Sequence, residues 1–496
     1  MQIKHKAMRL GLFLSITLTG FAVAGAVEVS CSPGSLGAQL RGQSGVDGLV
    51  VSGKIDASDL FFIADSLPSL RSLDLSSASI AAYDGELLHG HIQYLAATVP
   101  AGCFMGAPLE SVVFPAETTT LADGAFAGSR LRSVVLDTHT RATGFGVFAS
   151  CSQLREADFA ESSVGDYAFA GCVSLEKATV GGGTLAAGVF SGCSALERIH
   201  GGGNITSVGG RAFEGCGALE SFDFGAGLRT VGESAFAGSG LRAADMGLCP
   251  TDISIGGWAF SGCPNLESVV VPSGAVLGEG AFFGCTALES AEVPSGVGAV
   301  PDYAFAGAPL RNGSGVIPDG IVHIGAYALR GATGMRTVKL PASLISVGDY
   351  AMENMDGLAS IDAVALDAVP ATGTEVWRGV EQGVVELYTT TQTSTLFAGA
   401  PQWSDFKITV ESGATSPEAV APERLKAWFE GDVLVLSSQG GDIARARVFN
   451  AAGMLLADVA PASSTVRIFT TNTPGALFIV NATMAGSGTE TIKITR

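Results

Sequence analysis

Cysteine is the residue type in this sequence that most directly suggests chemistry, because nine cysteines could bind metal, form disulfides or act as nucleophiles. Six of them share one position, three residues after a recurring phenylalanine: Cys151, Cys172, Cys193, Cys216, Cys263 and Cys285. Other copies place Ser239 or Ala308 there. A slot that accepts Cys, Ser and Ala predicts a small buried position, filled by free thiols that behave as small hydrophobic side chains. Disulfides between neighbouring copies are the alternative.

Metal binding and catalysis find little support elsewhere in the sequence. No CxxC motif has a partner pair, so zinc is not indicated. His89 and His91 flank a glycine as metal ligands can, but no third ligand is evident nearby, and loop histidines without function are the alternative. GxSxG, HExxH and phosphate-binding loop motifs do not occur, and no histidine recurs in a setting that suggests a triad. We therefore expect a protein that is not an enzyme and uses no cofactor or metal.

The recurring phenylalanine has a regular period. Successive copies lie 21 to 24 residues apart, at Phe104, Phe126, Phe148, Phe169, Phe190, Phe213, Phe236, Phe260, Phe282 and Phe305, and Leu329 and Met352 continue the series. This period predicts a solenoid in which each copy forms one coil. A coil combines a half-buried strand, such as "LESVVVP" from Leu266 to Pro272, with a turn of the form GxxAFxGC, whose glycines permit positive φ. The Phe and Cys face the core, and stacked coils form a parallel sheet.

The text AFxGCxxLxxVxxP resembles the leucine-rich repeats of bacterial BspA-like proteins, from about Leu67 to Phe406. The resemblance implies a leucine-rich repeat solenoid of short parallel strands, with about thirteen coils. Both ends of such an array need covers. We expect an N-terminal cap at residues 27–66, the array at 67–383 and a C-terminal cap at 384–410. Trp403 and Phe406 are expected to close the last coil, with a ligand site at these aromatics as the alternative.

The first residues predict a secretory signal peptide at residues 1–26. Three basic residues precede an apolar run from Leu10 to Val23, and small residues lead to a cleavage site after Ala26. A lipoprotein signal that uses Cys31 is the alternative. No later stretch is long and apolar enough to span a bilayer. Without the leader, 47 acidic and 25 basic residues give a formal charge of −22, which repels nucleic acid and favours basic partners or divalent cations.

After a polar linker at residues 411–423, residues 424–496 contain short alternating strands, which predict a small β-sandwich. Three segments resemble the C-terminal sorting domains that carry bacterial proteins across an outer membrane to the cell surface: Val448–Leu456, Pro474–Val480 and Ile492–Arg496. Phe478 stands where these domains usually have tyrosine. The resemblance implies a sorting role, and a plain accessory domain is the alternative.

One surface of the predicted array has a readable pattern. In the strand text LxxVxV, the third and fifth positions point away from the core, and the third is mostly small or polar. The fifth position carries six acidic residues, which we call the acidic strip: Asp74, Asp158, Asp223, Asp245, Glu292 and Asp362. We expect the acidic strip to bind a basic protein segment. A solvated sheet face that resists aggregation is the alternative.

A regular array without a catalytic motif predicts recognition. We expect a secreted or cell-surface protein that uses its repeat surface for protein–protein recognition. The family resemblance implies adhesion to host matrix proteins or to other cells. A structural scaffold or a polysaccharide-binding protein is the alternative, but the outer strand positions carry no aromatic residue on which a sugar could stack, which favours a protein partner. The oligomeric state stays open.

Overall fold

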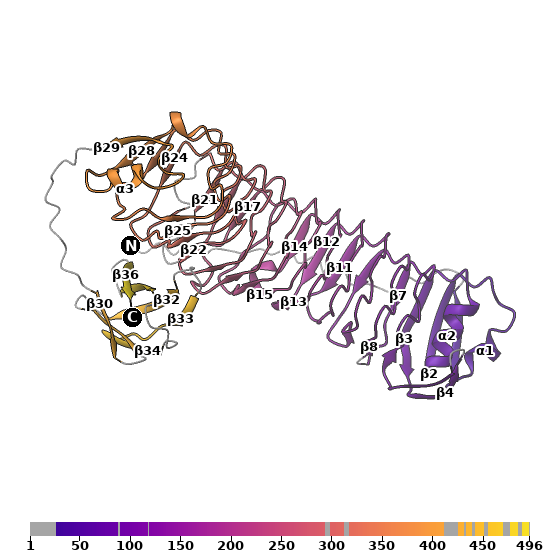
Figure 1. The fold of residues 1–496 in the computed structure, drawn as a ribbon. Helices are drawn as coiled ribbons and strands as arrows, with labels where there is room; N and C mark the ends of the chain where they lie inside the picture. The colour runs from indigo at the N-terminus through magenta and orange to yellow at the C-terminus, as the bar shows by residue number, and fades with distance from the viewer. Residues whose placement is uncertain are drawn as a thin grey trace, which may run out of the picture.

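A computed structural model describes residues 26–87, 90–117, 119–292, 298–311, 317–410, 425–430, 433–438, 442–450, 455–469, 477–484 and 489–495. Figure 1 shows a long bent array of coils, with small helices at its N-terminal end and a group of strands beside its C-terminal half. The predicted signal peptide, apart from Ala26, lies outside the described residues, as do His89 and the linker. None of the helices in the described part of the chain is long and apolar enough to cross a membrane.

The coils place short parallel strands in two rows, in which most strands pair with the equivalent strand of a neighbouring coil. The first row, which contains the LxxVxV text, comprises β3 (Ser72–Ile80), β7 (Ser111–Val113), β9 (Ser133–Val135), β11 (Glu156–Phe159), β12 (Lys177–Val180), β14 (Arg198–His200), β17 (Ala243–Asp245), β19 (Ser268–Val270), β21 (Ser290–Glu292), β24 (Thr337–Lys339), β26 (Ser360–Asp362), β28 (Glu386–Thr389) and β29 (Lys407–Val410). The second row comprises β6 (Thr98–Val99), β8 (Thr119–Leu121), β10 (Thr140–Arg141), β13 (Gly183–Leu185), β15 (Ile205–Val208), β16 (Thr230–Val231), β18 (Ser254–Ile255), β20 (Val276–Leu277), β22 (Ala299–Val300), β23 (His323–Ile324), β25 (Ser346–Val347) and β27 (Ala371–Thr372). The predicted leucine-rich repeat solenoid is confirmed.

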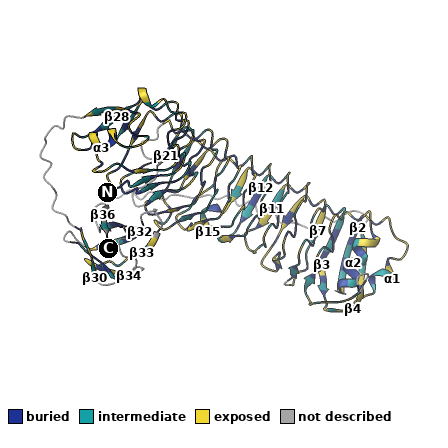
Figure 2. Ribbon diagram, viewed as in Figure 1, coloured by how far each residue is buried: buried dark blue, intermediate teal, exposed yellow. Residues whose placement is uncertain are grey.

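The recurring phenylalanines form a continuous ladder inside the coils. From Phe104 to Phe305, each of these rings is at most 1% exposed and stacks on the ring of the next coil, with centroids 5.1 to 5.9 Å apart. Leu329 and Met352 extend the ladder and are fully buried. Figure 2 shows buried residues alternating with exposed ones along the strands of the array. The ladder therefore forms the hydrophobic spine that the period predicted.

The cysteine slot differs from the expectation of a purely hydrophobic position. All six slot cysteines are free and fully buried, but each thiol lies 3.1 to 3.2 Å from a backbone carbonyl oxygen of an earlier coil and donates to it. The Cys263 thiol, for example, donates to the carbonyl oxygen of Phe236. Ser239 places a hydroxyl in the same slot, 3.4 Å from the sulfur of Cys263. The slot therefore favours a small side chain that carries a hydrogen-bond donor, which explains why Cys and Ser both occur there.

Two further devices hold neighbouring coils together. An aspartate three residues before the core ring accepts a backbone N–H of the next coil at Asp123, Asp166, Asp302 and Asp349, over 2.5 to 3.0 Å. Glycine is needed where the backbones approach most closely. A Cβ added at Gly278 would lie 2.5 Å from the nitrogen of Gly257, so no larger residue fits without displacement.

Both ends of the array are covered. The N-terminal cover contains β1 (Val27–Cys31), α1 (Leu36–Gln39), β2 (Gly48–Ile55) and α2 (Ala57–Ser66), followed by the hairpin of β4 (Tyr83–Leu87) and β5 (Gly90–Tyr94). Asp56 and Asp59 form a capping box at the start of α2. At the other end, α3 (Ser394–Ala398) lies near Trp403, which is 1% exposed and donates to the carbonyl oxygen of Pro370. Trp403 and Phe406 thus pack as end-cap residues and leave no exposed aromatic surface for a ligand.

The C-terminal unit consists of two antiparallel sheets. One contains β30 (Leu425–Glu430), β31 (Val433–Ser438) and β34 (Thr465–Phe469), and the other contains β33 (Leu455–Val459), β32 (Ile443–Asn450), β35 (Leu477–Met484) and β36 (Thr489–Thr495). Leu434, Leu436, Val448 and Val480 belong to a shared buried cluster. The sheets agree with the predicted β-sandwich, and the alternation of apolar residues explains which side of each strand faces that core.

Candidate functional site

The acidic strip lies on the outer face of the first row of strands. Asp158 pairs in register with Val135 on one side and Thr179 on the other, and Asp245 is likewise in register with Val270 and, across β19, with Glu292. Asp158, Asp223 and Asp245 are exposed. Asp74 and Asp362 are half-buried. The side chain of Glu292 lies outside the part of the chain that the structure describes.

Asp223 departs from the expected strand geometry. Its coil contributes no strand to the first row, so the first row is interrupted between β14 and β17. Phe222 occupies the inward position that holds a smaller residue, such as Val134 or Ala157, in other coils. The ring of Phe222 is tilted against Phe213 and packs edge-on against Phe236, with centroids 5.3 and 5.1 Å apart. A bulky ring at this position accounts for the interrupted ladder of backbone hydrogen bonds, although Asp223 still faces solvent.

Four aspartates of the acidic strip have a structural role that the sequence interpretation missed. In each, Oδ1 accepts the backbone N–H two residues later: Ser76 to Asp74 (2.8 Å), Ala160 to Asp158 (3.1 Å), Gly247 to Asp245 (2.9 Å) and Val364 to Asp362 (3.1 Å). This is an Asx turn, and the strand ends at or just after the aspartate in β11, β17 and β26, whereas β3 continues beyond Asp74 to Ile80. The sequence feature that could have predicted these Asx turns is the position of the aspartate close to the point where the strand ends and the chain turns. One carboxylate oxygen is thus used locally, and the negative charge is retained.

A second row of charges lies beside the acidic strip, at the residue that follows the repeat leucine. Glutamate and arginine from neighbouring coils form ion pairs there: Arg71–Glu110 (2.6 Å), Arg132–Glu110 (2.9 Å), Arg155–Glu176 (2.6 Å), Arg242–Glu220 (3.4 Å), Arg242–Glu267 (3.5 Å) and Arg311–Glu289 (3.2 Å). Hydrogen bonds from Arg71 and Arg132 hold the pKa of the Glu110 carboxyl below its usual range. We call this the paired row, because its charges are largely neutralised within the protein.

The charges of the acidic strip are not neutralised in this way. Within the described part of the chain, no ion pair reaches the carboxylates of Asp74, Asp158, Asp223, Asp245 or Asp362. The third strand position beside them supplies hydroxyl groups, and these contact one another between coils, at Ser72–Ser111 (3.1 Å) and Thr337–Ser360 (3.0 Å). The surface therefore presents uncompensated negative charge on a floor of small hydroxyl side chains.

A row of aromatic residues lies on the turns, where the sequence interpretation did not look for it. Trp258, Tyr303, Tyr327 and Tyr350 stand two residues before the ladder residue of their coils, each half-buried and each with φ between 53° and 58°. Tyr303 stacks on Tyr327 (4.8 Å, 9°), and Tyr327 stacks on Tyr350 (5.0 Å, 14°). Glycine also fills this slot in other coils, because a left-handed backbone is required there. The stacked rings cover each other's faces, so their edges are what they offer to solvent.

The candidate metal ligands do not assemble into a site in the described part of the chain. His91 Nε2 lies 2.7 Å from Asp84 Oδ1, and both side chains are exposed on the hairpin of β4 and β5. No group of three His, Cys, Asp or Glu side chains that could hold a metal ion occurs among the described residues.

Comparison with known proteins agrees with the geometry. The family model of the BspA type leucine rich repeat region matches residues 86–197, 183–311 and 313–365. A leucine-rich repeat protein from Bacteroides ovatus is 17% identical, with a TM-score of 0.52, over 79% of this chain and 93% of that chain. A leucine-rich cell surface protein from Faecalibacterium prausnitzii is 20% identical, with a TM-score of 0.32, over 56% and 86%. The pneumococcal vaccine antigen PcpA is 12% identical, with a TM-score of 0.28, over 78% and 85%. No curated protein matches the chain.

Proposed function

We propose, from the premise that the chain belongs to the BspA-type leucine-rich repeat family, that it is a surface protein that binds another protein through the acidic strip. Repeat arrays of this kind offer an extended regular face for protein–protein interaction. The partner segment that fits this face is basic, because this strand position carries six acidic residues against one lysine, Lys339, and no ion pair reaches the strip carboxylates in the described part of the chain.

The observation that carries the proposal is the contrast between two adjacent rows. In the paired row, Glu110 is matched by Arg71 and Arg132, so its charge contributes to the cohesion of the coils. In the acidic strip, Asp158 and Asp245 keep their charge without an ion pair in the described structure. Charge that serves only folding would be expected to be neutralised in both rows. Carboxylates without an ion pair make the electrostatic potential near this row more negative, and this potential attracts a positively charged partner.

The test replaces Asp158, Asp223 and Asp245 together by asparagine. Asparagine removes the charge but keeps an oxygen for the Asx turn, so we expect the melting temperature to stay within a few degrees of the original. Binding to purified extracellular-matrix proteins, measured by surface plasmon resonance at several salt concentrations, should weaken and lose part of its salt dependence.

A matched control removes three exposed carboxylates from other surfaces. Glu161, Asp367 and Glu381 are exposed and lie outside both rows, so their replacement by glutamine or asparagine changes the net charge by the same amount. If the control weakens binding as much as the strip variant does, net charge rather than the acidic strip governs capture. If neither variant has an effect, the strip is not the binding face.

We also propose that the protein is secreted or displayed on the cell surface and acts in adhesion. The support is the N-terminal leader in the sequence together with the likeness of the C-terminal strands to sorting domains. Burial of Cys31 in β1, which pairs along its length with β2, supports cleavage after Ala26 over lipid attachment at Cys31. Deleting residues 424–496 and following protease accessibility on whole cells tests the sorting role, which predicts loss of surface display.

Polysaccharide binding is the second candidate function, and the aromatic row is the observation that bears on it. A sugar ring stacks on an uncovered aromatic face, whereas Tyr303, Tyr327 and Tyr350 cover one another. The row therefore supports contact with protein side chains more than with a glycan chain. Binding to a glycan panel that is lost in Tyr327→Ala, but kept in the strip variant, would favour the second candidate.

A further inference from the structure

A cavity of about 880 Å³ lies at the N-terminal end of the array, beside the helix α2 (Figure 1). Three parts of the chain line it: α2, the hairpin strand β5, and the turn that contains Phe104 (residues 101–108). The hairpin of β4 and β5 is inserted between β3 and the regular coils, and it does not follow the repeat text. Insertions into a repeat array often lie on its binding face, so this cavity is a candidate site.

The lining of the cavity is mainly apolar, and it is open to solvent. The rings of the ladder are at most 1% exposed, whereas Phe61, Phe62 and Tyr94 are half-buried, and Met105 is 65% exposed. Ile92 and Tyr94 alternate along β5 with exposed residues, so one face of the hairpin lines the cavity. A cover that served only to close the array would be expected to bury these side chains, because their exposure to water costs free energy.

Two aromatic rings of the lining do not stack face to face. The centroids of Phe61 and Tyr94 lie 6.2 Å apart, and the ring planes are inclined by 46°. In the aromatic row on the turns, by contrast, Tyr303 and Tyr327 lie 4.8 Å apart at 9° and cover each other. The inclination of Phe61 and Tyr94 therefore leaves ring faces that a flat or positively charged group could contact.

The cavity also has polar groups that the fold leaves unpaired. Within the described part of the chain, the carboxylate of Asp65, the hydroxyl of Tyr94 and the thiol of Cys103 make no hydrogen bond or ion pair. The Cys103 side chain is 5% exposed, and it differs in this respect from Cys263, whose thiol donates to a backbone carbonyl oxygen. Small-molecule sites combine an apolar lining with a few polar groups that orient the ligand, and these three groups are available for that role.

Asp65 gives the cavity a negative charge, because it is the only acidic or basic residue among the described residues that line it. Burial, and then the charge of Asp65, raise the pKa of the Cys103 thiol. Burial, and then Cys103, raise the pKa of the Tyr94 hydroxyl, so both groups stay neutral at neutral pH. The formal charge of the whole chain, −19, acts in the same direction as Asp65. A positively charged ligand is therefore attracted to the cavity.

We propose that this cavity binds a small organic cation with an aromatic body, of the class of the aromatic amines. Its ammonium group pairs with the Asp65 carboxylate and lies against the ring face of Phe61 or Tyr94, and its aromatic body contacts Ile92 and Met105. A volume of about 880 Å³ is within the range of cavities that hold small molecules. The site is separate from the acidic strip, because none of the described residues that line it belongs to the strip.

Isothermal titration calorimetry on the chain from Val27 to Arg496 tests the charge of the ligand with three probes: phenethylamine, 2-phenylethanol and 3-phenylpropionate. They share a phenylethyl body and end in an ammonium group, a hydroxyl group and a carboxylate. We expect saturable binding of phenethylamine, about tenfold weaker binding of 2-phenylethanol and still weaker binding of 3-phenylpropionate, with a smaller preference for the amine at high salt. Absence of phenethylamine binding, or equal or tighter binding of either other probe, would overturn the proposal.

Two substitutions place the ligand in the cavity. Asp65→Asn removes the charge from an exposed position in the last turn of α2, where a carboxylate does not stabilise the helix, so the fold should be kept. This variant should bind phenethylamine roughly tenfold more weakly and lose the preference over 2-phenylethanol. Met105→Ala shortens an exposed side chain and should weaken the binding of both probes by a similar factor.

The matched control is Asp367→Asn, the same change at an exposed aspartate near the other end of the array, and it should leave binding unchanged. Equal responses to Asp65→Asn and Asp367→Asn would show that the net charge of the chain attracts the amine, and would overturn the proposal. Sedimentation of the same proteins tests the other occupant of an apolar cavity. A dimer that Met105→Ala abolishes would assign this face to a second copy of the chain in place of an amine.

Discussion

Replacement of Phe236 by alanine tests the hydrophobic ladder at its centre. The Phe236 ring is fully buried and stacks between Phe213 and Phe260, with centroids 5.1 and 5.3 Å away and interplanar angles of 11° and 3°. Removing such a ring costs about 3–5 kcal/mol in a packed core. The upper part of that range is expected here, because the rings of Phe222 and Phe224 also contact Phe236 and no neighbour can collapse into the space without leaving the stack.

The matched control is Phe236→Leu, because the protein itself places Leu329 and Met352, both fully buried, in the same slot of later coils. A leucine keeps most of the volume, so we expect the loss to stay near 1–2 kcal/mol. Urea denaturation followed by circular dichroism gives the free energy of unfolding of both variants. Hydrogen exchange should show lost protection mainly in the coils next to Phe236, since each coil contacts only its neighbours. Equal losses for alanine and leucine would refute the ladder as the source of cohesion.

Further predictions concern close approach, buried thiols and the N-terminal cover. Gly278→Ala should destabilise the array by about 1–3 kcal/mol, because its Cβ would meet the backbone of the previous coil, whereas Gly45→Ala, which meets nothing within 4 Å, should be neutral by urea denaturation. Burial raises the pKa of the Cys193 thiol from about 9 to about 12, so the folded state keeps a proton that the unfolded state releases. The contribution of this thiol to the free energy of unfolding should therefore be constant below pH 9 and fall as the pH rises from 9 to 12, so that the decrease above pH 9 is smaller in Cys193→Ser. Asp56→Ala should lower the melting temperature, by an amount equivalent to about 1 kcal/mol, because α2 loses its capping box.

The solenoid could be predicted from the sequence because every coil must bury the same types of residue against its two neighbours. Phe260 and Phe282 each need the same neighbours, so a single text recurs and its period can be read directly. The C-terminal strands could be read as well, because apolar residues alternate along them. In β30, for example, Leu425, Ala427 and Phe429 alternate with Lys426 and the exposed Trp428.

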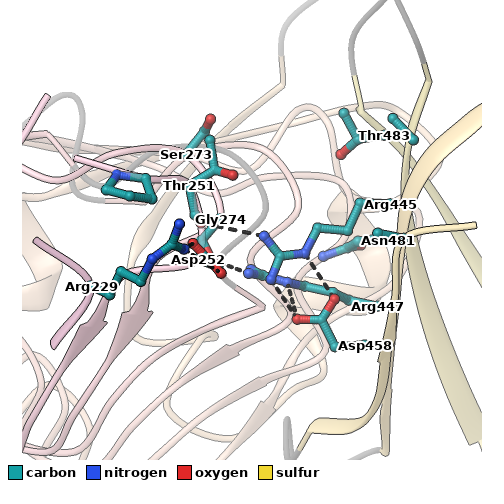
Figure 3. A pocket seen from close by; sticks show the side chains of 13 residues that line it. Arg229, Thr251, Asp252, Ser273, Gly274, Arg445, Arg447, Asp458, Asn481 and Thr483 are labelled. Carbon is teal, nitrogen blue, oxygen red and sulfur yellow. Dashed lines mark hydrogen bonds and ion pairs between the residues drawn. The ribbon is translucent and has the colours of Figure 1, made fainter. Parts of the chain in front are cut away.

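The candidate sites were harder to predict, because their meaning depends on what a side chain contacts. Asp158 reads as a surface charge in the sequence, but its Asx turn is visible only when the strand is known to end there. The sequence predicts a hydrophobic role for the Cys263 thiol, because its acceptor, the carbonyl oxygen of Phe236, belongs to an earlier coil and cannot be identified without the structure. The contact of β32 with the array could not be foreseen at all, since Thr251 and Gly274, whose carbonyl oxygens accept from Arg445 and Arg447 (Figure 3), lie 194 and 173 residues earlier in the chain.

Because the coils stack, residues at the same position of the repeat lie side by side in a row. Comparing the rows distinguishes charged residues that pair within the protein from charged residues that are available to a partner. The paired row contains residues of both signs, and where arginine and glutamate stand in neighbouring coils, as at Glu220, Arg242 and Glu267, each finds a counter-ion in the next coil. In the acidic strip, aspartate is followed by an uncharged residue, as at Asp158 and Thr179, or by a second aspartate, as at Asp223 and Asp245. A row that contributes to cohesion by ion pairing needs residues of both signs in neighbouring coils, because a like charge in the next coil is repulsive. In the row of the acidic strip the one Lys or Arg is Lys339, in register with Asp362, so we expect an ion-pair partner for Asp158 and Asp245 from outside the array.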